Sequence, residues 1–212
     1  MKARSQFSST RKKRSSTTVG KANAAEARTE ARALEELRRH GRQRNVEGMA
    51  HFGIRAQHVL GVSKPKLDAM IRDFDNWDVC DGTCCHLFVF ARPAWAKAFA
   101  WTRRKPEFEK RAAFAPAAYL AVHDKEAKDE PFRRFLGVIE REAGDHRNFV
   151  RKAVNWALRS IGKRNRRLNR AAIACAERIR NQGKGAARWI ANDALRELKS
   201  DAVRERLKRK DR

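Results

Sequence analysis

The chain is divided into helix-length segments, and no stretch alternates apolar and polar residues for long enough to predict a strand. Apolar residues recur every three or four positions, and the segments end at glycine, aspartate or proline. Successive helices of about 10 to 18 residues joined by short breaks favour antiparallel pairs, which can stack into solenoids. We therefore predict an all-α fold, a curved α-solenoid of antiparallel helical pairs. No repeat of fixed period is visible, so the pattern alone does not separate a solenoid from a bundle.

Capping residues and prolines set the expected limits of the helices. Asp75 is expected to cap the helix that carries Trp77, and Asp145 the helix that carries Trp156. Pro116 lies inside a helical segment, which it should kink or split in two. The expected helices cover residues 25–41, 46–52, 63–71, 77–90, 93–101, 106–119, 129–143, 145–161, 168–179 and 186–198, and a charged segment, 201–212, ends the chain.

Residues 1–24 differ from the rest of the chain. They are rich in Ser, Thr, Lys and Arg and almost free of large apolar side chains, and the first acidic residue is Glu26. Such a segment buries too little surface to offset its ordering entropy. We therefore expect a disordered basic tail over 1–24 and a helical domain over 25–212. The basic run at 11–14 (RKKR) is more typical of a DNA-contacting arm or a plain tail than of a targeting signal.

The net charge indicates a polyanionic partner. The chain has 50 Lys and Arg against 25 Asp and Glu, a formal charge of +25, and this excess is typical of nucleic-acid binding. An anionic membrane is the competing partner, but no apolar run approaches the roughly 20 residues of a spanning helix. The first 25 residues also contain no signal peptide. We expect a cytoplasmic protein and, because no heptad seam is visible, a monomer.

The densest basic surface is predicted over residues 147–170. Apolar positions there leave the opposite helix face free, so the cations can form a stripe whose phosphate contacts would depend steeply on salt. The alternative is a solvated helix face. Trp156 interrupts the stripe and either stacks on a sugar or base or packs in the core. The candidate DNA-binding residues are Arg147, Arg151, Lys152, Arg159, Lys163, Arg164, Arg166, Arg167 and Arg170.

The cysteines raise the question of a metal site. Cys80, Cys84, Cys85 and His86 form a C-x3-C-C-H pattern, but the last three fan around a helix and a second ligand pair is missing. Small buried side chains are the better interpretation. With Cys175, the four cysteines do not resemble a disulfide framework, which favours a reducing compartment. We expect no metal and no cofactor, since no P-loop, dinucleotide-binding or catalytic-triad motif is present.

Trp77 and Asp81 are four positions apart, so on a helix both side chains project from one face. A carboxylate within so basic a surface opposes the polyanion that the surface attracts, and its presence needs a reason. The structural reason is that Asp81 pairs with a neighbouring arginine and Trp77 fills a helix interface. With five Trp and eleven Phe against one Tyr, most aromatic residues should lie in the core, Trp95 and Trp189 among them.

Four stretches resemble the bacterial DNA alkylation repair glycosylases that are built from HEAT-like helical repeats. Residues 75–81 (DNWDVCD) and 147–159 (RNFVRKAVNWALR) carry the resemblance, and the second stretch is the more specific. Residues 52–54 (FGI) and 187–196 (ARWIANDALR) look like the opening and closing helices of that family. The resemblance extends from about residue 30 to about residue 205.

The resemblance implies a HEAT-like solenoid whose basic concave face holds duplex DNA, in a nucleoid-associated protein of the bacterial cytoplasm. Members of that family hydrolyse the N-glycosidic bond of N3- and N7-alkylated purines without a metal. Carried over, Asp81 is the catalytic carboxylate, and Trp77 and Trp156 flank the sugar of the lesion. Arg111, in the short motif KRAA, looks like the arginine that contacts backbone phosphate. Such a carboxylate would stabilise an oxocarbenium-like sugar and position or deprotonate water.

One departure from the family pattern concerns the length of the N-terminal half. Family members usually carry a further helical pair between the FGI and DNW motifs, where residues 63–74 leave room for one helix. A missing repeat could expose core or shift the groove, because each repeat buries its neighbours' faces. One alternative is therefore a catalytically impaired, HEAT-like nucleic-acid-binding protein. Another is a basic protein-interaction solenoid, whose binding would lack the salt dependence of phosphate contacts.

Overall fold

The computed structural model describes residues 64–91, 93–183 and 185–210, and in these ranges it contains helices and no strand. The all-α class is thus confirmed for this part of the chain. The expected tail at 1–24, the expected helices between residues 25 and 52 and the Ser63 cap lie outside the described residues. The elements are α4 (Lys64–Met70), η1 (Ile71–Asp73), α5 (Trp77–His86), η2 (Phe88–Phe90), α6 (Ala94–Trp101), α7 (Glu107–His123), α8 (Asp129–Glu142), α9 (Asn148–Gly162), α10 (Arg166–Asn181), α11 (Ala186–Leu198) and α12 (Asp201–Lys210).

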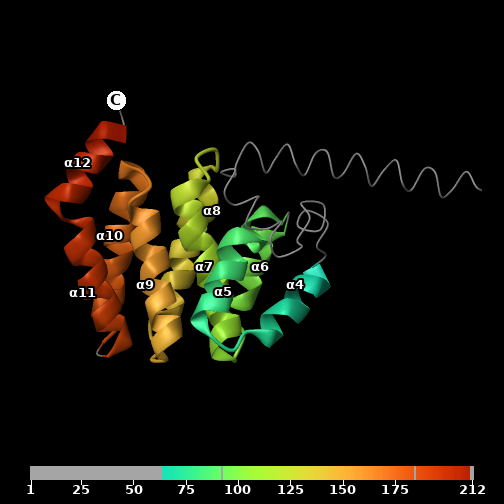
Figure 1. The fold of residues 1–212 in the computed structure, drawn as a ribbon. Helices are drawn as coiled ribbons and strands as arrows, with labels where there is room; N and C mark the ends of the chain where they lie inside the picture. Colours follow the sequence, from blue (N-terminus) through green and yellow to red (C-terminus); the bar gives the residue numbers. More distant parts are fainter. Residues whose placement is uncertain (1–63, 92, 184, 211–212) are drawn as a thin grey trace, which may run out of the picture.

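The helices form two layers. In the first layer α5 packs on α7, α7 on α9 and α9 on α11; in the second layer α6 packs on α8 and α8 on α10. Each helix of the second layer also packs against helices of the first. Figure 1 shows α4 at one side of the molecule, then α5 and α6, then α7 and α8, then α9 and α10, with α11 and α12 at the opposite side. This order is what stacked helical pairs produce.

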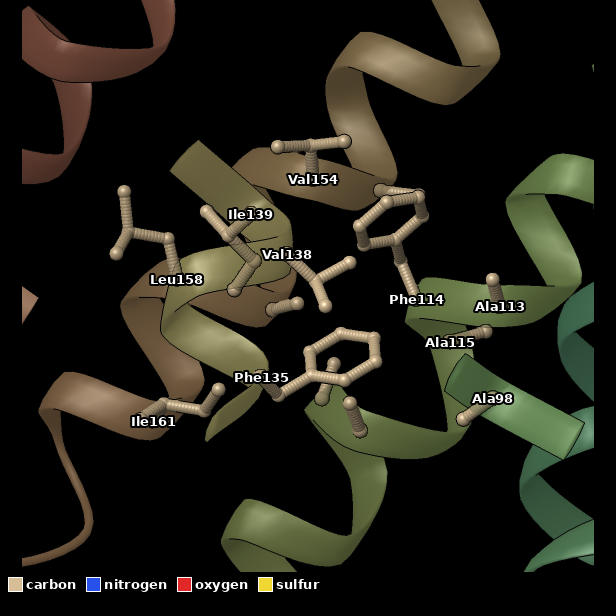
Figure 2. Packing of buried hydrophobic residues seen from close by; sticks show 14 of the residues in the cluster. Ala98, Ala113, Phe114, Ala115, Phe135, Val138, Ile139, Val154, Leu158 and Ile161 are labelled. Carbon is tan, nitrogen blue, oxygen red and sulfur yellow. The ribbon is translucent and has the colours of Figure 1, made fainter. Parts of the chain in front are cut away.

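The apolar core lies between the two layers. Phe135 of α8 is fully buried, and its ring contacts Phe99 of α6 at 5.2 Å, Phe114 of α7 at 5.7 Å and Trp95 of α6 at 5.9 Å between centroids. Trp95 therefore packs on the core, as predicted. Figure 2 shows the aliphatic side chains that complete this cluster from α8 and α9: Val138, Ile139, Val154, Leu158 and Ile161.

α7 is the central helix of the first layer, and Pro116 does not split it: the helix is continuous from Glu107 to His123. A proline has no N–H for the carbonyl four residues earlier, which here belongs to Ala112. The thiol of Cys84 donates to this carbonyl oxygen, with 3.8 Å between sulfur and oxygen. Burial raises the pKa of the Cys84 thiol well above its usual range, so the sulfur keeps its proton as a donor.

The four cysteines are free and buried, which confirms their interpretation as small core side chains. Cys80 also faces α7, where its thiol donates to the Phe108 carbonyl at 3.5 Å. Cys175 on α10 donates to the Leu136 carbonyl at 3.4 Å, and burial raises its pKa to about 12. Each thiol therefore joins neighbouring helices through a backbone oxygen.

Two predicted helix caps are wrong. The cap of α5 is Asn76, whose Oδ1 accepts the Val79 N–H at 2.9 Å, while Asp75 accepts the side chain of Asn76. α9 begins at Asn148 rather than directly after Asp145. A residue distant in sequence supplies its cap, because Glu107 Oε1 accepts the Phe149 N–H at 2.8 Å. A capping residue on another helix leaves no local pattern in the sequence.

Other helix limits differ by a few residues from those expected. α5 ends at His86 and a separate 3-10 turn, η2, follows it, whereas one helix to residue 90 was expected. The charged segment after residue 200 forms α12, with Val203 and Leu207 buried. In the part of the chain that the structure describes, no helix combines the length and apolar character that crossing a membrane requires.

Candidate functional site

A groove of about 380 Å³ lies on the first layer of helices. All of its lining residues come from α5, α7, α9 and α11, so the groove runs across the whole layer. On α9 these residues follow helical spacing and form one face, because the intervening positions Ala153, Val154 and Ala157 are buried in the core. The lining residues are Trp77, Asp81, Arg111, Lys152, Asn155, Trp156, Arg159, Trp189 and Asp193.

Asp81 is held by Arg111 in a two-pronged ion pair. Arg111 Nε donates to Asp81 Oδ1 at 2.8 Å, and Nη2 donates to Oδ2 at 2.6 Å. The third nitrogen, Nη1, donates to the carbonyl oxygen of Phe149 at 2.7 Å. The side chain of Arg111 is only 8% exposed and that of Asp81 is 19% exposed. The guanidinium therefore joins α5, α7 and α9 and fixes the plane of the carboxylate at the groove.

The two predicted aromatic residues lie in the same groove as Asp81. Trp77 opens α5 and is 51% exposed, which is high for so large an apolar side chain. Trp156 of α9 is partly buried against the core. Asp81, Trp77 and Trp156 thus lie in one groove, and Trp77 does not fill a helix interface.

Trp189 is not the core residue that the sequence predicted. It is 40% exposed and lines the groove from α11. The guanidinium of Arg151 lies over its ring, 4.7 Å from the centroid. One signal in the sequence could have identified it: Trp189 and Asp193 repeat the four-residue spacing of Trp77 and Asp81.

Asn155 and Asp193 are groove residues that sequence reasoning missed. Asn155 is buried, and its Nδ2 donates to Asp193 Oδ2 at 2.7 Å. Arg196 donates to the other oxygen of Asp193 at 2.5 Å, and Arg159 approaches Oδ2 to 3.5 Å. Asp193 is therefore neutralised from several sides, whereas the described partner of Asp81 is Arg111 alone.

Beyond the groove on α11, Glu197 holds two cations of α9. Lys163 donates to one oxygen at 2.5 Å and Arg159 to the other at 2.8 Å. Partial burial raises the pKa of Glu197, but the hydrogen bonds and charges of Lys163 and Arg159 outweigh it and lower the pKa. Part of the expected basic stripe is thus neutralised by α11.

The expected DNA-binding cations do not share one surface. Lys152 is exposed and Arg159 partly exposed in the groove, and Arg151 stands beside it over Trp189. Arg147 instead pairs with Asp145 at 2.6 Å. The remaining positions lie elsewhere: Arg166, Arg167 and Arg170 belong to α10 in the second layer.

The side chain of Arg164 packs against the protein instead of lining the groove. Its Nη1 and Nη2 donate to the backbone at the end of α7 and in the following loop, including the carbonyl oxygen of Ala127 at 2.6 Å. Its guanidinium also covers the ring of Phe132 at 4.6 Å from the centroid. Cations are favoured at helix C-termini because the last carbonyls lack helical partners. The structure thus assigns Arg164 to the junction of α7 and α8.

The groove combines exposed indoles, an oriented carboxylate and cations on an all-helical scaffold, in a chain of strongly basic composition. A family model described as DNA alkylation repair enzyme matches residues 65–198, more than half of the chain. The chain belongs to this family, and its role is in the repair of alkylated DNA. Comparisons with curated proteins and with solved structures gave no match. The matched residues include every side chain that lines the groove.

Proposed function

We propose that the protein is a DNA glycosylase that hydrolyses the N-glycosidic bond of N3- and N7-alkylated purines in duplex DNA. The observation that carries the proposal is the carboxylate of Asp81, which Arg111 orients at a groove shared with Trp77 and Trp156. The proposal also rests on membership of the DNA alkylation repair family.

Asp81 would act on the sugar of the damaged nucleotide. In the reaction the bond between C1′ and the purine nitrogen breaks, and its electron pair neutralises the cationic base. The sugar becomes oxocarbenium-like, and a nearby carboxylate stabilises such a charge. Water then forms the new bond to C1′, and its proton passes to Asp81 or to solvent. The alkylated base is a good leaving group, so the reaction requires no general acid.

Trp77 and Trp156 would hold the sugar while its charge develops. The faces of indole rings carry negative electrostatic potential and attract cationic centres. Both rings reach the groove from different helices, α5 and α9, which supports contact with two sides of one nucleotide. A pocket that receives a flipped base is not required by this arrangement.

Arg111 would act as a positioning residue for Asp81. The resemblance assigned it to backbone phosphate, but its Nε, Nη1 and Nη2 all donate to protein acceptors and its side chain is 8% exposed. Each oxygen of Asp81 accepts one of these bonds, and an ionised carboxylate has about four acceptor sites in total. Sites therefore remain for a water molecule or for the developing charge of the sugar.

The DNA backbone would be held mainly by cations that have no acidic partner among the described residues. Lys152 is exposed in the groove, and Arg151 lies beside it. Each phosphate that such a cation neutralises releases counterions, which makes binding salt-dependent. A protein-interaction solenoid would not show this dependence.

The test is release of 7-methylguanine and 3-methyladenine from methylated duplex DNA by the wild type, Asp81→Asn and Asp78→Asn. Asp78 is an exposed carboxylate on the same helix and is the matched control. We expect base release by the wild type and by Asp78→Asn, and a loss of at least about 100-fold for Asp81→Asn.

Three results would contradict the proposal. Equal release by Asp81→Asn would remove Asp81 from the reaction, and equal losses in both variants would show a nonspecific charge effect. No release by the wild type, with salt-dependent duplex binding retained, would identify a catalytically impaired DNA-binding member of the family. Thermal unfolding of each variant establishes that the protein is folded at the assay temperature.

A further inference from the structure

The groove contains the same pair of residue types at both of its ends. Trp77 and Asp81 line it from α5, and Trp189 and Asp193 line it from α11, with four-residue spacing in each pair. The described large apolar side chains that are exposed are Trp77, Val79 and Trp189, so two of the three lie in this groove. Exposed indoles gathered in one groove indicate a surface that contacts a ligand.

The two pairs differ in what surrounds the carboxylate. Asp81 is held by Arg111, whereas Asp193 receives bonds from Asn155 and Arg196 and lies 3.5 Å from Arg159. Asp193 has two guanidinium groups beside it, Arg196 and Arg159, whereas Asp81 has one, so a further positive charge is less favourable next to Asp193. The α11 pair is therefore not a second reaction centre.

The surroundings of Trp189 suit a sugar–phosphate unit. Arg151 covers the ring at 4.7 Å, and its single described hydrogen bond runs from Nη2 to Asn148 Oδ1 at 3.2 Å. Lys152 is exposed and has no ion pair among the described residues. A partly exposed indole beside two cations without acidic partners in the described part of the chain provides a stacking surface together with phosphate donors.

We propose that Trp189, with Arg151 and Lys152, forms a second DNA-holding subsite that binds an undamaged deoxyribose–phosphate unit of the strand. The proposal rests on the proposed function in taking DNA as the ligand, but it does not require base release. Asp193 and Asn155 act as positioning residues, since their hydrogen bond joins α11 to α9.

The spacing of the helices gives the subsite a place on the strand. α11 packs directly on α9, and packed helices lie about 8–10 Å apart. Successive nucleotides rise by about 3.4 Å along one strand. A strand that crosses the layer therefore meets Trp189 roughly two or three nucleotides from the one at Trp156. The subsite contributes affinity for duplex DNA without reading the lesion.

The test is the affinity of the full chain for an unmodified DNA duplex, measured over a series of salt concentrations. The variants are Trp189→Ala, Trp189→Phe and Arg151→Ala. We expect Trp189→Ala to weaken binding about five- to fiftyfold, within the range for an aromatic side chain stacked on a nucleotide. Trp189→Phe should restore most of the affinity. Arg151→Ala should also reduce the slope of log affinity against log salt by about one, as expected for one lost phosphate contact.

The matched control is Arg134→Ala. Arg134 of α8 also covers an aromatic ring, that of Phe99 at 5.2 Å, but the pair belongs to the second layer and not to the groove. We expect its affinity and salt slope to equal those of the wild type. Thermal unfolding shows whether each variant is folded.

The outcomes separate this subsite from the proposed glycosylase. Wild-type affinity in folded Trp189→Ala would overturn the subsite, even if Asp81→Asn abolishes base release. Equal losses in Trp189→Ala and Arg134→Ala would also overturn it. Selective loss of duplex binding in Trp189→Ala, with no base release by the wild type, would establish the subsite and reject the glycosylase.

Discussion

Asp81 and Arg111 should be coupled in the free energy of unfolding, and their geometry sets the size of the effect. The two bonds between them measure 2.8 and 2.6 Å, and both side chains are largely shielded from solvent. A hydrogen bond to a charged group contributes about 1.5–3 kcal/mol. Two such bonds, reduced by the cost of removing both charges from water, give an expected coupling of about 2–4 kcal/mol.

A double-mutant cycle measures this coupling. Arg111→Met leaves the Asp81 carboxylate partly buried without its cation and removes a donor from the Phe149 carbonyl, so we expect a loss of about 3–5 kcal/mol. For a domain of this size the loss corresponds to a fall in Tm of about 6–20 °C. Combining Arg111→Met with Asp81→Asn should cost less than the sum of the single variants, because the amide of Asn does not need a cation.

The assay is urea unfolding followed by far-UV circular dichroism for the wild type, both single variants and the double variant. The control cycle uses Arg178 and Glu140, an ion pair between α10 and α8 in which Arg178 is 55% exposed. Exposed pairs couple by about 0.2–1 kcal/mol. Additive losses at Asp81 and Arg111, within about 0.5 kcal/mol, would refute the reasoning, since no buried ion pair would then exist in solution.

Two further predictions concern the scaffold. Gly162→Ala should destabilise the protein by about 1–3 kcal/mol, because a Cβ there would lie 2.6 Å from a methyl group of Leu198. Gly137→Ala in α8 meets no neighbouring atom and should stabilise the protein by about 0.5–1 kcal/mol. Urea unfolding measures both changes. Partial burial raises the pKa of Asp145. The hydrogen bonds and charges of Arg147 and Lys110 have the larger, opposite effect, and the pKa lies well below its usual range. Asp145 thus stabilises the fold above its unfolded pKa of about 3.9, and this stabilisation is lost as the pH falls below that value. The Tm difference between wild type and Asp145→Asn should therefore shrink from pH 6 to pH 2, and a constant difference would contradict the assignment.

The sequence predicted elements whose signals are local. The limits of α11 follow from its apolar spacing and the glycine before it, and α6 follows Pro93 as expected. The shared face of Trp77 and Asp81 follows from helical spacing alone. These features need only the geometry of one helix.

The predictions that failed depended on neighbouring helices. Glu107 caps α9 from α7, and the thiol of Cys84 reaches from α5 to the carbonyl that Pro116 leaves without a donor. Trp189 was assigned to the core because aromatic residues are usually buried, but α11 is the last helix of the first layer and turns this residue toward the groove. The acids that neutralise part of the basic stripe, Asp193 and Glu197, also lie on α11, 34 to 38 positions away in sequence.

The sequence left two explanations for a carboxylate in a basic surface, a structural ion pair and a catalytic acid, and the structure makes them compatible. Arg111 offsets the charge of Asp81, so the pair as a whole does not repel a polyanion that enters the groove. A purely structural pair would not account for Trp77, which remains 51% exposed next to it although burial of an indole is favourable. A binding site can combine an ion pair that stabilises the helices with an exposed indole that a bound ligand covers. Duplex binding should therefore quench the fluorescence of Trp77, and a Trp77→Phe variant that binds duplex DNA with an unchanged fluorescence response would show that the indole is not covered by the strand.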